Sequence, residues 1–117
     1  MSAPLGTFLW LVLAAQGSVT AATPPPPDLE VFGRLQQNLE CQPIEDPDDI
    51  LGHCWITARF RISRVVRGRA PSRLITIRYL AHTYRVEGRL IRLKLRANAS
   101  GTNTVCAVPG GEGLRCG

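Results

Sequence analysis

Histidines, which often serve as acids and bases near neutral pH, are scarce in this sequence. The chain contains two, His53 and His82, each beside the end of a predicted strand. Nucleophilic catalysis needs a nucleophile, a base and a group that orients the base. No Gly-x-Ser-x-Gly motif, phosphate-binding loop or spaced pair of metal ligands accompanies these histidines. We therefore predict that the protein is not an enzyme and has no catalytic residue, metal or cofactor.

Acidic side chains gather in residues 42–53, which carry Glu45, Asp46, Asp48 and Asp49 around two prolines. Calcium takes about six to eight oxygen ligands, and a carboxylate cluster on a loop is one source of them. The spacing here lacks the glycine and the distal glutamate of an EF-hand loop. We interpret the segment as the solvated tip of a hairpin.

The most distinctive side chains are basic and are suited to binding. The net charge is +5, but residues 28–50 carry seven acidic residues and one basic residue, whereas residues 51–117 carry thirteen basic and two acidic residues. A set of six basic residues is predicted to point outward from the strands as one cationic face: Arg59, Arg61, Arg78, Arg92, Lys94 and Arg96. Such a face attracts polyanions by releasing their counterions. The acidic loop has the opposite charge, so a second hypothesis is that it lies across this face.

The elements that position these arginines are predicted to be strands. Apolar residues alternate with polar ones from Cys54 to Ile62, and a second such run covers residues 74–79 after a Gly-x-Ala-Pro break, which together indicate a hairpin. The alternation slips by one residue near Arg64, as in a β-bulge. It returns over Arg89–Ala97, with Ile91, Leu93, Leu95 and Ala97 predicted to point inward.

Residues 29–40 fit two interpretations. An apolar stripe behind Asp28 is compatible with a helix, whereas alternation at odd positions is compatible with a strand. If Cys41 opposes Cys54 on a neighbouring strand, Leu39 faces Ile56, Leu35 faces Phe60 and Gly33 faces Ile62. The apolar sides then coincide, which favours the strand, and Gly33 becomes a bend point.

The four cysteines form an even set behind a predicted export signal, which indicates disulfides in an oxidising compartment. Three connectivities are possible. We prefer Cys41 with Cys54 across two strands, and Cys106 with Cys116 across a hairpin centred on Gly111.

The N-terminal segment is predicted to be a targeting signal. Residues 5–15 are an apolar run of signal-peptide length, and small residues follow at 19–22. The run is too short to span a bilayer. The predicted organisation is a signal peptide at 1–22, a Pro-rich spacer at 23–28 and a disulfide-stapled β-barrel domain at 29–117, exported to the periplasm or secreted, with no transmembrane span in the mature protein.

Two stretches resemble the netrin-like module of the tissue inhibitors of metalloproteinases and of bacterial exported relatives. Residues 31–35 are similar to the first strand of that module, and residues 60–68 with 75–79 are similar to a later strand pair. The resemblance implies an OB-fold barrel. Inhibitors of this family chelate the protease zinc through a cysteine at the mature N-terminus, whereas the first cysteine here is Cys41.

The predicted fold is therefore mainly β, a small OB-fold-like barrel of five to six antiparallel strands with no long helix. The predicted function is non-catalytic binding of a protein or an anionic envelope polymer through the cationic face. One alternative is a basic OB-fold protein that binds nucleic acid, with Trp55 and either Tyr84 or Tyr79 as stacking side chains; export would argue against it. A protease-inhibitor-like protein is a further alternative.

Overall fold

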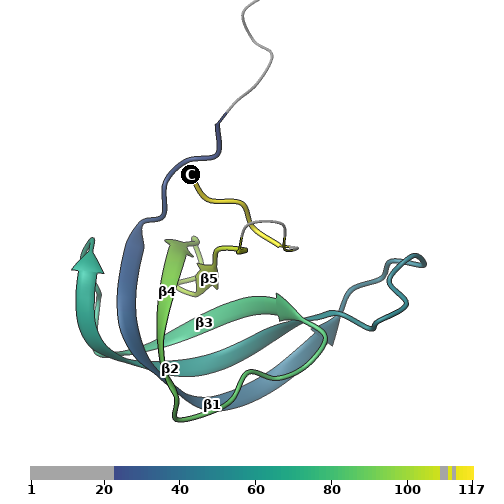
Figure 1. The fold of residues 1–117 in the computed structure, drawn as a ribbon, viewed down its shortest axis with the longest axis horizontal. Coiled ribbons are helices and arrows are strands. Elements are labelled where there is room, and N and C mark those ends of the chain that lie inside the picture. Colours follow the sequence, from purple (N-terminus) through teal and green to yellow (C-terminus); the bar gives the residue numbers. More distant parts are fainter. Residues whose placement is uncertain (1–22, 109–110, 112) are drawn as a thin grey trace, which may run out of the picture.

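The computed structural model describes residues 23–108, 111 and 113–117, so the predicted signal peptide lies outside the described residues. Five strands form a closed barrel in the order β1-β2-β3-β5-β4 (Figure 1). The strands are β1 (Leu29–Pro43), β2 (Cys54–Arg67), β3 (Leu74–Ala81), β4 (Leu90–Ala97) and β5 (Asn103–Val105). The described residues contain no helix, and therefore none long and apolar enough to cross a membrane. The predicted small, mainly-β, OB-like barrel is confirmed.

One strand pair departs from the predicted antiparallel arrangement. β3 and β5 are parallel, whereas the other four neighbouring pairs are antiparallel. If every neighbouring pair were antiparallel, strand direction would alternate around the closed barrel, and this is possible only with an even number of strands. A closed barrel of five strands therefore needs a parallel pair, and β5 supplies it.

Residues 29–43 form a strand and not a helix. The predicted register holds where Gly33 pairs with Ile62 and Leu35 pairs with Phe60, but it shifts beyond Leu35, so that Cys41 pairs with Ile56. The predicted pairing of Leu39 with Ile56 is wrong, because β1 carries extra residues between its pairs with β2. Leu39 is 45% exposed as a result.

β2 also carries the expected irregularity. Ser63 has no partner between the pairs Gly33–Ile62 and Phe32–Arg64, which confirms the predicted bulge near Arg64. A further shift leaves Val66 without a partner on β1. The bulges keep Arg64 on the same side of the sheet as Phe32.

Both predicted disulfides are present, with Cα–Cα distances of 5.5 Å for Cys41–Cys54 and 5.7 Å for Cys106–Cys116. The first joins diagonal and not opposed positions, because Cys54 pairs with Pro43. The predicted antiparallel hairpin around Gly111 is wrong, since Cys106 and Leu114 form a parallel bridge. Two disulfides indicate an oxidising environment.

The inward positions of the strands fill the barrel. The largest fully buried side chains are Tyr79, Phe60, Leu35, Ile56, Ile77, Leu95 and Val31. On β4 the predicted inward residues Leu93 and Leu95 are buried, whereas Ala97 at the strand end is exposed.

The Pro-rich segment is not a free spacer. The Pro25 carbonyl accepts a hydrogen bond from the Gly117 amide at 2.7 Å, and the Arg96 guanidinium donates to the carbonyls of Pro25 and Pro26. Asp28 continues this attachment, because its amide donates to the Leu95 carbonyl at 2.9 Å. The barrel unit thus begins before Leu29.

Residues 82–89 connect β3 to β4 and are held against β1. The buried Tyr79 hydroxyl donates to Asn38 Oδ1 at 2.6 Å and accepts from the Arg85 amide at 2.9 Å. The backbone amide of Asn38 donates a hydrogen bond to Glu87 Oε2 at 3.0 Å. The Tyr79 hydroxyl thus links β3 and the connection that follows it to β1, which is distant in sequence.

Gly33 provides a first test of this packing. A Cβ at this position would lie 2.2 Å from the Arg61 carbonyl oxygen and 2.6 Å from Phe60 Cε2. We expect Gly33→Ala to lower the free energy of unfolding by about 1–3 kcal/mol, as overpacking does, because the Arg61 carbonyl belongs to the β1–β2 pairing. Urea unfolding followed by circular dichroism measures the loss.

The matched control is Gly88→Asn. Gly88 has a φ of +82°, and no atom lies within 4 Å of the position that a Cβ would take; asparagine tolerates this backbone conformation. Its effect should stay within about 0.5–1 kcal/mol. Equal losses in the two variants would contradict the proposed role of close approach at Gly33.

Tyr79→Phe tests the phenol link. The change leaves Asn38 Oδ1 and the Arg85 amide without their partner, so we expect a loss of about 1–3 kcal/mol. Burial raises the pKa of Tyr79; a raised folded-state pKa gives stability that is complete below the unfolded pKa and is lost as pH rises through the folded value. The thermal stability measured from pH 8 to 11 should therefore fall more steeply for the native chain than for Tyr79→Phe. Tyr84→Phe, at a residue that is 54% exposed, should change neither quantity.

Candidate anion-binding face

Outward positions of β2, β1 and β4 form three cross-strand rows on one wall of the barrel. Inward neighbours on β1, such as Val31 and Leu35, are buried, which fixes the intervening side chains on the outside. The rows are Arg67–Glu30–Lys94, Arg64–Phe32–Arg92 and Arg61–Arg34–Leu90. We call these nine residues the arginine face.

The arginine face carries six cations and one acidic residue. That residue, Glu30, is only 7% exposed and forms an ion pair with Arg92. A buried carboxylate needs such a partner, because removal from water is costly for an unpaired charge. The ion pair therefore fixes Arg92 and leaves the face strongly positive.

Phe32 lies at the centre of the middle row. The guanidinium carbons of Arg64 and Arg92 lie 4.8 and 5.4 Å from the centroid of its ring. These are cation–π distances, at which the negative face of the ring attracts the cation. The aromatic ring thus holds two arginines from the strands on either side of β1.

The six basic residues of the predicted cationic face are divided between two walls. Arg61, Arg92 and Lys94 belong to the arginine face. Arg78 and Arg96 lie on another wall, where Thr104 of β5 pairs with both of them. Arg59 lies on β2 between Gln37 of β1 and Thr76 of β3, two residues from Arg61. The structure therefore does not bring the six together as one face, because β2 and β4 are separated by β1 on one side and by β3 and β5 on the other.

The arginines on the second wall already have intramolecular contacts. The Arg78 guanidinium lies 4.4 Å from the Trp55 ring centroid, and Arg96 is bonded to the Pro-rich segment. Side chains with such contacts have fewer donors left for a ligand.

Three cations of the arginine face were missed by the sequence prediction. In the strand interpretation of residues 29–40, the odd-numbered residues point inward, so Arg34 should point outward. This alternation could have identified Arg34 as part of the face. Arg64 and Arg67 follow the bulges, where simple alternation no longer assigns a side.

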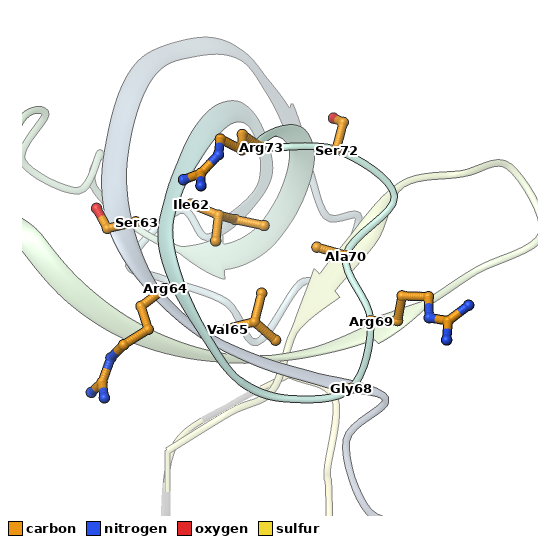
Figure 2. Close-up of a pocket in the computed structure, with 9 residues that line it drawn as sticks. All are labelled: Ile62, Ser63, Arg64, Val65, Gly68, Arg69, Ala70, Ser72 and Arg73. Atoms are coloured by element: carbon orange, nitrogen blue, oxygen red, sulfur yellow. The ribbon is translucent and has the colours of Figure 1, made fainter.

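A cavity of about 420 Å³ adjoins the arginine face, between the last residues of β2 and the connection to β3. In Figure 2 the side chains of Ile62, Val65 and Ala70 line its interior, while Arg64 and Arg69 point away from it. The cavity thus has an apolar floor and a basic rim.

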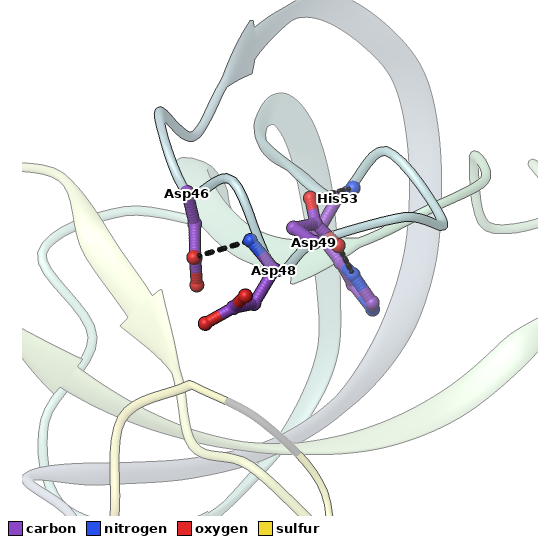
Figure 3. A network of polar contacts seen from close by, with 4 residues as sticks. All are labelled: Asp46, Asp48, Asp49 and His53. Atoms are coloured by element: carbon purple, nitrogen blue, oxygen red, sulfur yellow. Dashed lines mark hydrogen bonds and ion pairs between the residues drawn. The ribbon is translucent and has the colours of Figure 1, made fainter.

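The acidic loop extends away from the barrel (Figure 1) and forms hydrogen bonds within itself. Asp46 Oδ1 accepts a hydrogen bond from the Asp48 backbone amide at 2.9 Å (Figure 3). Asp49 Oδ2 accepts from the His53 backbone amide at 2.6 Å, and Asp49 Oδ1 lies 2.6 Å from His53 Nδ1. The His53 and His82 rings meet edge to face, with centroids 5.4 Å apart. Within the described parts of the chain, no group of three or more histidines, cysteines and acidic residues is placed to hold a metal ion.

Comparison with known proteins finds no matching family model, no matching curated protein and no matching solved structure. The resemblance to the netrin-like module therefore stays a prediction.

The Asp49–His53 contact predicts a measurable titration. The His53 hydrogen bond holds the pKa of Asp49 below its ordinary value of 3.8. A lowered folded-state pKa gives stability above the unfolded pKa that is lost as pH falls through the folded value. Carbon-detected NMR should show the Asp49 pKa rising toward its ordinary value in His53→Ala. The control His82→Ala removes only the ring contact and should leave the Asp49 pKa unchanged; a rise of the same size in both variants would contradict the assignment.

Proposed function

We propose that the protein is a non-catalytic binding module that holds a partner with closely spaced negative charges on the arginine face. The observation that carries this proposal is the gathering of six cations around Phe32 on one wall of the barrel. The proposal keeps the class of function predicted from the sequence. Of the six predicted binding residues it keeps three, and Arg34, Arg64 and Arg67 take the place of the other three.

The spacing of the cations supports the recognition of a polymer. Adjacent rows are two residues apart along a strand, which is about 6.6 Å, and electrostatic screening acts over about 8 Å at physiological ionic strength. The cations of adjacent rows therefore act together on one charged chain. Binding by such an array releases counterions and weakens with added salt.

Export to an oxidising compartment is part of the proposal, and the disulfides support it. Two disulfides favour an oxidising environment and hence export. An exported protein meets acidic proteins and anionic envelope polymers, whereas a cytosolic one meets nucleic acid. The protease-inhibitor alternative gains no support, since Cys41 is bonded to Cys54 in the β1–β2 hairpin.

Retention on heparin and on polyphosphate as a function of salt tests the proposal. We expect the double variant Arg61→Gln/Lys94→Gln to bind more weakly, and the slope of log K against log salt to become shallower by about one per lost contact. The matched control Arg78→Gln/Arg115→Gln changes the net charge equally outside the arginine face. Its affinity should fall only slightly.

Two results would overturn the proposal. Equal losses in the two double variants would mean that net charge alone determines binding. A single-stranded oligonucleotide bound much more tightly than heparin and polyphosphate, with Trp55→Ala abolishing that preference, would favour the nucleic-acid alternative instead.

A further inference from the structure

The last part of β2 extends beyond its partner strand β3. The β2–β3 pairing ends at Arg61 and Leu74, and one further hydrogen bond joins the Ile62 amide to the Arg73 carbonyl at 2.7 Å. In the described chain, the segment Ser63–Arg67 has strand partners on β1 only, through Arg64, Val65 and Arg67. The other edge of this segment therefore faces the cavity without a neighbouring strand.

The cavity beside this edge is apolar inside. Ile62 belongs to the core and is 4% exposed, whereas Val65 above it is 41% exposed. Ala70 contributes the opposite wall and packs against the core. A volume of about 420 Å³ falls in the range of about 300–1,000 Å³ that is usual for ligand sites.

The rim of the cavity carries arginine and serine side chains. Its polar lining residues are Ser63, Arg64, Arg69, Ser72 and Arg73, and none of the nine lining residues is acidic. Arginines along an edge discourage pairing with a second copy of the same chain, because like charges would meet. The same charges favour an acidic segment.

The turn that forms the far wall is held in place. Gly68 has a φ of +85°, and a Cβ there would lie 2.2 Å from the Asp28 carbonyl oxygen. Asp28 is itself fixed, since its carboxylate accepts a hydrogen bond from the Ala97 amide at 2.9 Å. The turn therefore rests against the start of β1, and the cavity is preformed.

We propose that the free edge of β2 binds an extended acidic peptide segment of a partner protein, which places one branched apolar side chain in the cavity. In strand addition, main-chain hydrogen bonds provide affinity and side-chain pockets provide specificity. A polysaccharide or nucleic acid offers neither a strand backbone nor an aliphatic side chain. The inference rests on the proposed function in expecting an acidic partner, but its site shares only Arg64 and Arg67 with the arginine face.

A synthetic peptide library tests the inference. The probes are octapeptides in which glutamates flank two central positions that carry every residue type. We expect the native protein to select leucine, isoleucine or valine at a central position, with amide chemical-shift changes in Ser63–Arg67. Methylation of alternate backbone nitrogens in the best peptide should abolish binding.

The variant Ala70→Leu fills the cavity without changing the charge. We expect it to weaken the best peptide about tenfold and to leave heparin retention unchanged. The matched control Val86→Leu adds bulk at a residue that is 63% exposed and lies outside both the cavity and the Ser63–Arg67 edge; it should bind the peptide normally. Thermal unfolding confirms that both variants are folded.

The outcomes separate this inference from the proposed function. Absence of apolar selection, or equal binding of the methylated peptide, overturns the inference while heparin retention by the arginine face still stands. Loss of heparin binding in Arg61→Gln/Lys94→Gln together with normal peptide selection supports both. Equal weakening of the peptide by Ala70→Leu and Val86→Leu also overturns the inference.

Discussion

β1 must pair with two strands at once, and the rest of the barrel depends on this requirement. Its first residues pair with β2 on one edge and with β4 on the other. A strand shared in this way must coil strongly, and Gly33 gives the coil room, because any side chain there would meet Phe60 and the Arg61 carbonyl. The missing side chain at this position lets β1 approach β2 closely within the closed barrel.

The same shared strand assembles the arginine face. Residues of β2 and β4 that are far apart in sequence become neighbours only through β1, whose outward residues lie between them. Phe32 then holds a guanidinium from each side, and Glu30 neutralises part of the charge. The gathering of positive charge is tolerable because one buried carboxylate lies among the cations and the remaining cations stay hydrated.

Local sequence patterns predicted β1 to β4 and both disulfides, since alternation and cysteine spacing report directly on neighbouring residues. They did not predict β5, which is only three residues long. They did not predict which walls carry Arg78 and Arg96, because that depends on how five strands close. The failed pairing of Leu39 has a similar cause: a bulge changes the side on which every later residue falls, and a single sequence gives no count of bulges. The attachment of Pro25 to Gly117 was also beyond prediction, because it joins the two ends of the described chain through backbone atoms, which carry no sequence signal.

That attachment has a consequence for how the molecule is tethered. The Pro-rich segment and Gly117 lie side by side at one end of the barrel (Figure 1). Any polypeptide joined to either of them is therefore anchored at the same point of the barrel. A pull on both ends would first load the Pro25–Gly117 hydrogen bond and the Arg96 contacts, and would reach the strands only after these had opened.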